Sequence, residues 1–110
     1  LPLPPVPVDK ADAIDWLEGR LAAPRDGVLH VVYHTIAWQY FPAETQARGR
    51  DMIEAAGAKT TASAPLAWLR MEADGQEPGA ALDLRLWPGD RHVPLGRIDF
   101  HGRWVDWAAP

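Results

Sequence analysis

The sequence predicts an α/β fold in which helices pack on a mixed sheet of about five strands. Two largely apolar stretches, 28–35, which is rich in valine, and 64–72, flank an amphipathic stretch at 42–56. This is the order of a strand–helix–strand unit. After residue 79, short apolar stretches alternate with turn residues, which is typical of an antiparallel meander. We therefore expect a parallel strand pair first and an antiparallel extension after it.

The composition is that of one globular domain with a linker-like start. Of the 110 residues, 47% are hydrophobic and 24% are charged, which is ordinary for a globular fold. Residues 1–8 are rich in proline and predict an extended segment, because proline cannot continue a helix. We interpret residues 9–110 as a single α/β domain. The proline-rich start without methionine favours a C-terminal fragment of a longer protein.

Charge and cysteine content narrow the classes of partner. The net charge of −4 and the lack of any basic run argue against a nucleic-acid partner, because a phosphate backbone would be repelled. Cysteine is absent, which excludes disulfides and thiolate chemistry and fits a reducing compartment. No apolar run approaches the ~20 residues of a membrane span. We expect a cytoplasmic protein with neither a nucleic-acid nor a membrane partner.

The first helix is expected directly after Asp9, which can cap its amino end. Apolar residues then recur at helical spacing, at Ala13, Ile14, Leu17 and Leu21. Residues 24–27 end this helix with proline and glycine. The following stretch, 28–35, has apolar side chains on both of its faces. It therefore predicts an interior strand that is covered on both sides.

The second helix connects the two strands of the parallel pair. Pro42 suits its first position, and Gly57 is expected as its C-cap. Gly49 lies on its apolar face and is expected to let the helix approach the sheet closely. The alternative is a tolerated glycine that costs up to ~1 kcal/mol. Because the connection is a helix, we expect strands 28–35 and 64–72 to be parallel.

The last third of the sequence predicts antiparallel strands. Leucines alternate with polar or aromatic residues over 82–87, the pattern of a half-buried strand. Residues 88–90 end it, and a later pair of strands turns at His101 and Gly102. A two-residue turn there sets Ile98 opposite Val105, Arg97 opposite Asp106 and Gly96 opposite Trp107. This register predicts a cross-strand ion pair between Arg97 and Asp106.

Titratable residues at the ends of the two parallel strands mark the candidate site. His34 is near the end of the first strand and Glu72 ends the second, where ligands of open α/β sheets bind. As catalytic residues, His34 would be a general base or substrate anchor and Glu72 its acidic partner. The alternatives are a locally hydrogen-bonded histidine and a solvated carboxylate beside Arg70. The sequence leaves open whether His34 and Glu72 meet.

Three further residues are candidates for a substrate pocket at the same edge. Trp38 and Tyr40 follow His34 directly, and Arg70 shares a strand face with Glu72. Alternatively, the aromatic residues plug the end of the sheet or face another domain. No metal site is expected, because His30 and His34 are ~13 Å apart along a strand. Motifs for nucleotide binding and for a serine nucleophile are missing from the sequence.

The chain resembles the C-terminal third of a bacterial family, the domain of unknown function 2332 family. The resemblance covers most of residues 10–108 and rests on short motifs in the same order, at 31–35, Arg48, 66–72, 86–89 and 100–107. Members are much longer than this chain, which implies that the N-terminal part of its own polypeptide is its first partner. No activity is established for the family, so the resemblance implies no reaction.

The order of elements is also similar to the C-terminal half of a Rossmann-like methyltransferase, an analogy of fold alone. It implies that a longer protein could bind S-adenosylmethionine, whereas these residues lack a glycine-rich loop and bind no cofactor by themselves. Two hypotheses stay open. In one, the domain is one wall of a small-molecule or cofactor site in an enzyme, with His34 and Glu72 at its rim. In the other, it is a non-catalytic scaffold or protein-interaction domain, for example in a homodimer.

Overall fold

The computed structural model describes residues 3–22 and 24–109 and confirms an α/β fold. The elements are α1 (Ala13–Leu21), β1 (His30–Thr35), a 3-10 helix η1 (Trp38–Tyr40), α2 (Ala43–Ala58), β2 (Leu66–Glu72), β3 (Ala80–Trp87), β4 (Arg91–Ile98) and β5 (Val105–Trp107). Of the proline-rich start, residues 3–8 contain no helix or strand, and residues 1–2 lie outside the described residues. None of the helices in this part of the chain has the length and hydropathy needed to cross a bilayer.

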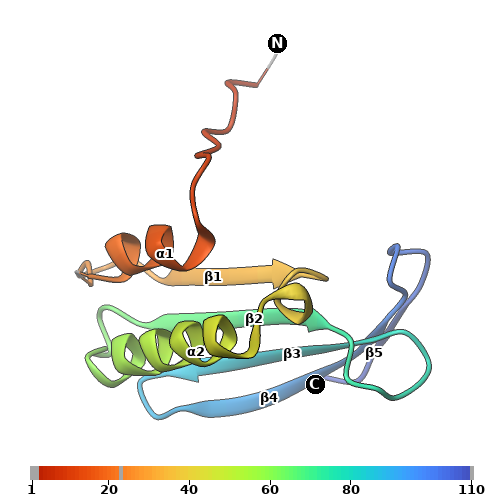
Figure 1. Cartoon of the computed structure of the whole chain (residues 1–110). Coiled ribbons are helices and arrows are strands. Elements are labelled where there is room, and N and C mark those ends of the chain that lie inside the picture. Colours follow the sequence, from red (N-terminus) through yellow and green to blue (C-terminus); the bar gives the residue numbers. More distant parts are fainter. Residues whose placement is uncertain (1–2, 23, 110) are drawn as a thin grey trace.

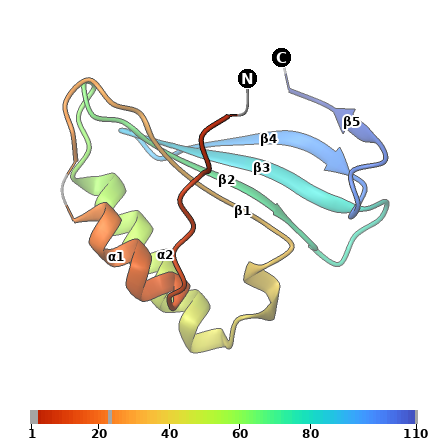
Figure 2. The same ribbon diagram turned by 90° about the horizontal axis from the view of Figure 1, so that it is seen from above.

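The strands form a mixed sheet in sequence order (Figure 1). β1 and β2 are parallel, and β2 to β5 pair antiparallel, as predicted. Both α-helices lie side by side on one face of this sheet (Figure 2). The core fills the space between that face and the helices, with Trp68 and Ile53 fully buried at 0% exposure. No described helix covers the opposite face.

α1 is capped by Asp12, and the prediction that Asp9 caps it is wrong. One carboxylate oxygen of Asp12 accepts the backbone N–H groups of Ile14 (3.1 Å) and Asp15 (3.0 Å). A capping side chain reaches only the first few amides after it, and Asp9 lies too far upstream. The Asp9 carboxylate instead accepts the indole N–H of Trp16 at 2.7 Å. Asp9 therefore ties the extended start to the outer surface of α1.

Two glycines set how closely α2 packs, but not in the predicted roles. Gly57 lies inside the last turn of α2, and the C-cap is Lys59. A Cβ atom on Gly57 would lie 2.5 Å from the ring of Trp87, so this glycine brings the helix onto the sheet. A Cβ atom on Gly49 would instead lie 2.5 Å from Trp38 and 2.9 Å from Ile14. Gly49 therefore allows close contact with η1 and α1 rather than with the sheet.

β1 is the outer strand of the sheet, and the prediction of an interior strand covered on both sides is wrong for the described residues. Its burial alternates, with Val32 and His34 half-buried toward the helices and Val31 and Tyr33 exposed on the other face. Apolar side chains on both faces of a strand do not reveal whether a second strand pairs with each of its edges, or which segment would cover each face. That is why the pattern alone misplaced β1.

β3 confirms the predicted alternation, but the helices cover its polar and aromatic face. Arg85 and Trp87 are buried on the helix side, and the leucines are half-buried on the opposite face. The buried guanidinium of Arg85 lies 4.7 Å from the ring centroid of Trp87 and pairs with Asp90 at 2.9 Å and Glu54 at 3.6 Å. Aromatic and carboxylate partners together compensate its burial.

The β4–β5 register is confirmed at all three pairs, Gly96 with Trp107, Arg97 with Asp106 and Ile98 with Val105. The predicted ion pair between Arg97 and Asp106 is wrong. The Arg97 guanidinium binds Asp74 at 2.7 Å and the carbonyls of Pro78 (2.7 Å) and Gly79 (2.9 Å). The loop after β2 thus offers several acceptors for the N–H groups of the guanidinium, whereas the Asp106 carboxylate alone would satisfy fewer of them.

Candidate functional site

The parallel register brings the ends of β1 and β2 to one edge of the sheet. His34 lies beside Arg70 and Thr35 beside Met71, so Glu72 follows immediately at the same edge. His34 and Glu72 both lie on the helix-facing side. The Nδ1 atom of His34 is 2.6 Å from Oε2 of Glu72. The structure therefore brings into contact the two residues whose meeting the sequence left open.

The Glu72 carboxylate also binds the backbone that follows β1. Its Oε1 atom accepts the N–H groups of Ala37 at 3.0 Å and Gln39 at 3.3 Å. The side chains of His34 and Glu72 are only 13% and 15% exposed, so these contacts are partly shielded from water. Gln39 adds a second link between the same two segments, because its side-chain oxygen accepts the N–H of Ala73, the residue after β2, at 3.0 Å. Glu72 thereby fixes the connector between β1 and α2 against the end of β2.

The second ring nitrogen of His34 is occupied as well. The indole N–H of Trp68 lies 3.0 Å from Nε2 of His34, and an indole nitrogen can only donate. Nε2 must therefore accept, and Nδ1 carries the proton that is donated to Glu72. A chain of hydrogen bonds runs from Trp68 through His34 to Glu72, and it assigns one tautomer to His34.

Aromatic packing surrounds this chain of hydrogen bonds. Trp38 stacks on the imidazole of His34, with ring centroids 4.9 Å apart and planes inclined by 18°. Trp38 also lies 5.5 Å from the ring centroid of Trp68. Trp38 is thus a packing partner of His34, whereas Tyr40, predicted with it, is 73% exposed.

Arg70 belongs to the same cluster. Its guanidinium carbon lies 4.7 Å from the ring centroid of Trp68, and its Nε donates to Asp83 at 2.8 Å. Both charged side chains are about one third exposed, at 30% and 33%. Of the five predicted residues, four gather around Trp68, which the sequence reasoning did not single out. The signal was present, because Trp68, Arg70 and Glu72 alternate along one strand and must share a face.

The backbone at Ile36 is strained. Its φ angle is +47°, in the left-handed region that β-branched residues avoid. Such a conformation costs about 1–3 kcal/mol and persists only where its surroundings enforce it. The N–H of Ile36 donates to the carbonyl of Met71 at 2.8 Å, and the next N–H, of Ala37, donates to Glu72. The end of β2 therefore holds the strained residue from both sides.

Within residues 3–22 and 24–109, no group of three or more His, Cys, Asp or Glu side chains could hold a metal ion. Neither the curated proteins nor the solved structures include a match to this chain. A family model, in contrast, matches residues 3–107. The chain therefore belongs to the bacterial family described as "Uncharacterized protein conserved in bacteria (DUF2332)".

Proposed function

We propose that the carboxyl ends of β1 and β2 form one wall of a small-molecule site in a Rossmann-like enzyme. The observation that carries the proposal is the strained residue Ile36, held at φ +47° between Met71 and Glu72. Backbone strain enforced in this way clusters at active sites and ligand clamps. The location supports the same proposal, because ligands of open α/β sheets bind beyond the carboxyl ends of the strands.

In this proposal His34 and Glu72 are positioning residues that hold the wall. Both nitrogens of His34 and both oxygens of Glu72 already have partners within the protein. For His34 to act as a catalytic base, Trp68 would first have to release Nε2. The side chains beside them that reach solvent are the exposed Tyr40 and the partly exposed Arg70, whose Nε is paired with Asp83.

The remaining walls would come from another segment of a longer polypeptide. In doubly wound sheets the ligand crevice forms where the strand order reverses. Among the described residues no strand pairs with the outer side of β1, and a further parallel strand there would create that point. S-adenosylmethionine does not fit the described residues alone. The turn after β1, at Thr35, Ile36 and Ala37, contains no glycine to cradle a cofactor. A methyltransferase-like activity would need its cofactor held elsewhere.

Ligand-dependent stabilisation of the longest natural polypeptide that contains this chain tests the proposal. S-adenosylmethionine and ATP are the probes, and thermal unfolding is measured with and without each. We expect at least one probe to raise Tm in the unaltered protein and in the control Arg50→Gln on α2, but not in Arg70→Gln. An equal rise in both variants would contradict the proposed wall, because Arg70 would then not face the ligand.

A second candidate function is a non-catalytic interaction module that pairs with a second copy of this chain. The observation that favours it is the outer position of β1 in the sheet, together with its Val31 and Tyr33 side chains, which are 47% and 70% exposed on the face opposite the helices. β1 carries no Lys, Asp, Glu or Pro, the residues that natural edge strands use to prevent pairing. Sedimentation equilibrium would then give a dimer that Tyr33→Lys dissociates and Tyr40→Lys preserves. A monomer at all concentrations would rule this function out.

A further inference from the structure

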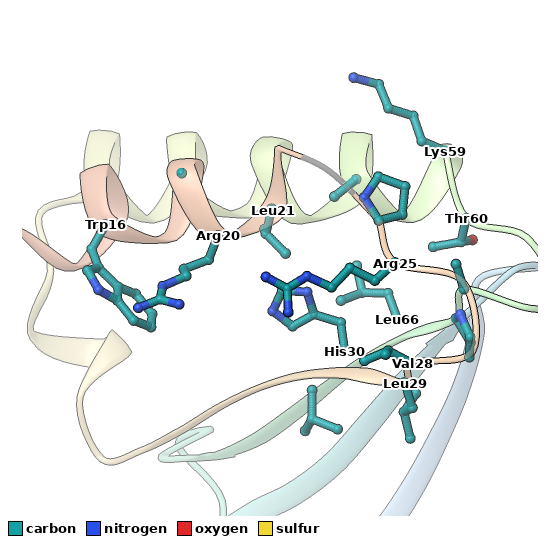
Figure 3. Close-up of a pocket in the computed structure, with 16 residues that line it drawn as sticks. Trp16, Arg20, Leu21, Arg25, Val28, Leu29, His30, Lys59, Thr60 and Leu66 are labelled. Atoms are coloured by element: carbon teal, nitrogen blue, oxygen red, sulfur yellow. The ribbon is translucent and has the colours of Figure 1, made fainter. Parts of the chain in front are cut away.

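A cavity of about 590 Å³ lies at the opposite end of the parallel strands from His34 and Glu72. It is bordered by α1, the carboxyl end of α2 and the amino ends of β1 and β2, and it is open to solvent (Figure 3). Its volume is within the range of pockets that bind small molecules. The cavity is independent of the proposed site, because it shares none of that site's residues.

Apolar side chains form the greater part of the cavity's surface. Leu21 enters from α1 and Leu66 from the start of β2, and both belong to or pack against the hydrophobic core. Val28 and Leu29 line the side next to β1, and Leu29 is 54% exposed there. The apolar part of a ligand would therefore remove these exposed side chains from water.

The charged side chains at this cavity all have one sign. Among the described residues that line it are three cations and a histidine, and none is Asp or Glu. They are Arg20, Arg25, Lys59 and His30. The chain as a whole carries a net charge of −4, so the cavity is a local exception to an acidic protein. Such an exception would attract anions.

The four basic residues are not equivalent. The Arg20 guanidinium is already engaged, 3.5 Å from Asp9 and 4.9 Å from the ring centroid of Trp16. Lys59 points away from the cavity in Figure 3. Arg25 and His30 point into the space between α1 and the strands, and neither forms an ion pair in the part of the chain that the structure describes. Arg25 is therefore the cation available to a ligand.

We propose that this cavity binds a small amphipathic anion, an apolar body that carries a single phosphate or carboxylate group. Arg25 binds the anionic group through its planar fork of N–H donors, which matches both phosphate and carboxylate oxygens. His30 supplies a second polar contact, and the apolar body lies against Leu21 and Leu66. This ligand is recognised by sign of charge and by hydrophobicity together, which neither inorganic phosphate nor a neutral alcohol satisfies.

Binding of four matched six-carbon compounds tests this inference. Hexyl phosphate, hexanoate, hexanol and hexylamine differ only in their head group, and backbone NMR chemical shifts of the whole chain report where each binds. We expect the two anions to shift resonances at residues 19–31 and 56–66 saturably at micromolar to millimolar concentration. The difference between hexyl phosphate and hexanoate identifies the preferred head group. Hexanol and hexylamine should bind at least about tenfold more weakly.

Two arginine variants separate the anion site from general effects of charge. Arg25→Ala, in an exposed loop, should weaken binding of hexyl phosphate by about tenfold and keep the melting temperature. Arg50→Ala, which removes the same charge from α2 outside the cavity, should leave binding unchanged. The inference is overturned if hexanol binds as tightly as the anions, if the shifts map to the sheet face opposite the helices, or if none of the compounds binds.

Discussion

Replacing Glu72 by glutamine should destabilise the protein although the two side chains have nearly the same shape. The reason is the direction of the hydrogen bonds. The Trp68 indole N–H can only donate, so His34 accepts at Nε2 and donates from Nδ1, and Oε2 of Glu72 must accept. Oε1 must also accept, from the N–H groups of Ala37 and Gln39. A carboxylate offers two acceptor atoms, whereas an amide offers one acceptor and one donor.

The size of the effect follows from this mismatch. In either orientation of the amide, one N–H group faces another donor inside a partly buried cluster. Reversing the tautomer of His34 only moves the conflict to Trp68. An unsatisfied buried donor costs about 1–3 kcal/mol. We expect Glu72→Gln to lower the free energy of unfolding by about 2 kcal/mol and Tm by about 10 °C. The control Glu77→Gln, in an exposed loop, should change stability by less than about 0.5 kcal/mol.

A double-mutant cycle with Trp68→Phe refines the assay, which is chemical denaturation monitored by circular dichroism. Phenylalanine removes the donor that fixes the tautomer of His34, so the imidazole can reverse and accept from the amide that Glu72→Gln introduces. Trp68→Phe should therefore cost less in the Glu72→Gln background than in the unaltered protein, with a coupling energy of about 1 kcal/mol. Additive losses, or a Glu72→Gln variant as stable as the unaltered protein, would refute the reasoning.

Two further predictions concern packing and the loop after β2. Gly57→Ala should destabilise the protein by about 1–2 kcal/mol in urea denaturation, because the new methyl group would overlap the buried ring of Trp87. The control Gly19→Ala has free space around the new methyl group and should stabilise the protein by up to about 1 kcal/mol in the same measurement. The hydrogen bond from Arg97 lowers the pKa of Asp74. The unaltered protein should therefore be more stable than Asp74→Asn by a full and constant difference at pH values above the ordinary carboxyl pKa, and this difference should disappear as pH falls through the lowered pKa of Asp74. A difference in stability that grows toward low pH would contradict this assignment.

Much of the fold could be predicted because its signals are local. The strand–helix–strand order follows from two periodicities in the sequence, and the register of Ile98 with Val105 follows from one short turn. The failures arise where a partner is distant in sequence. Arg97 binds Asp74 because the loop after β2 folds back over β4, and no cross-strand rule describes that contact. Likewise, the apolar pattern of β1 could not reveal that its outer edge has no described neighbour.

The sequence indicated where His34 and Glu72 would lie, but not which hydrogen bonds they would form. Strand ends at one edge of a parallel pair indicated where His34 and Glu72 would lie. The alternation of Trp68, Arg70 and Glu72 indicated a shared face. The contact of the Trp68 indole with His34, however, depends on the register that sets His34 beside Arg70, which the sequence does not specify. The strain at Ile36 is equally invisible, because isoleucine after a strand is an ordinary choice for an extended residue.

The central claim is that Trp68, His34 and Glu72 form one directed chain of hydrogen bonds that holds the end of β1. The tautomer of His34 in solution tests it most directly, measured at neutral pH from the ¹⁵N chemical shifts of the two ring nitrogens. The claim predicts a proton on Nδ1 and an unprotonated Nε2 that accepts the Trp68 indole. A proton on Nε2 with Nδ1 unprotonated, or rapid exchange between the two forms, would contradict it.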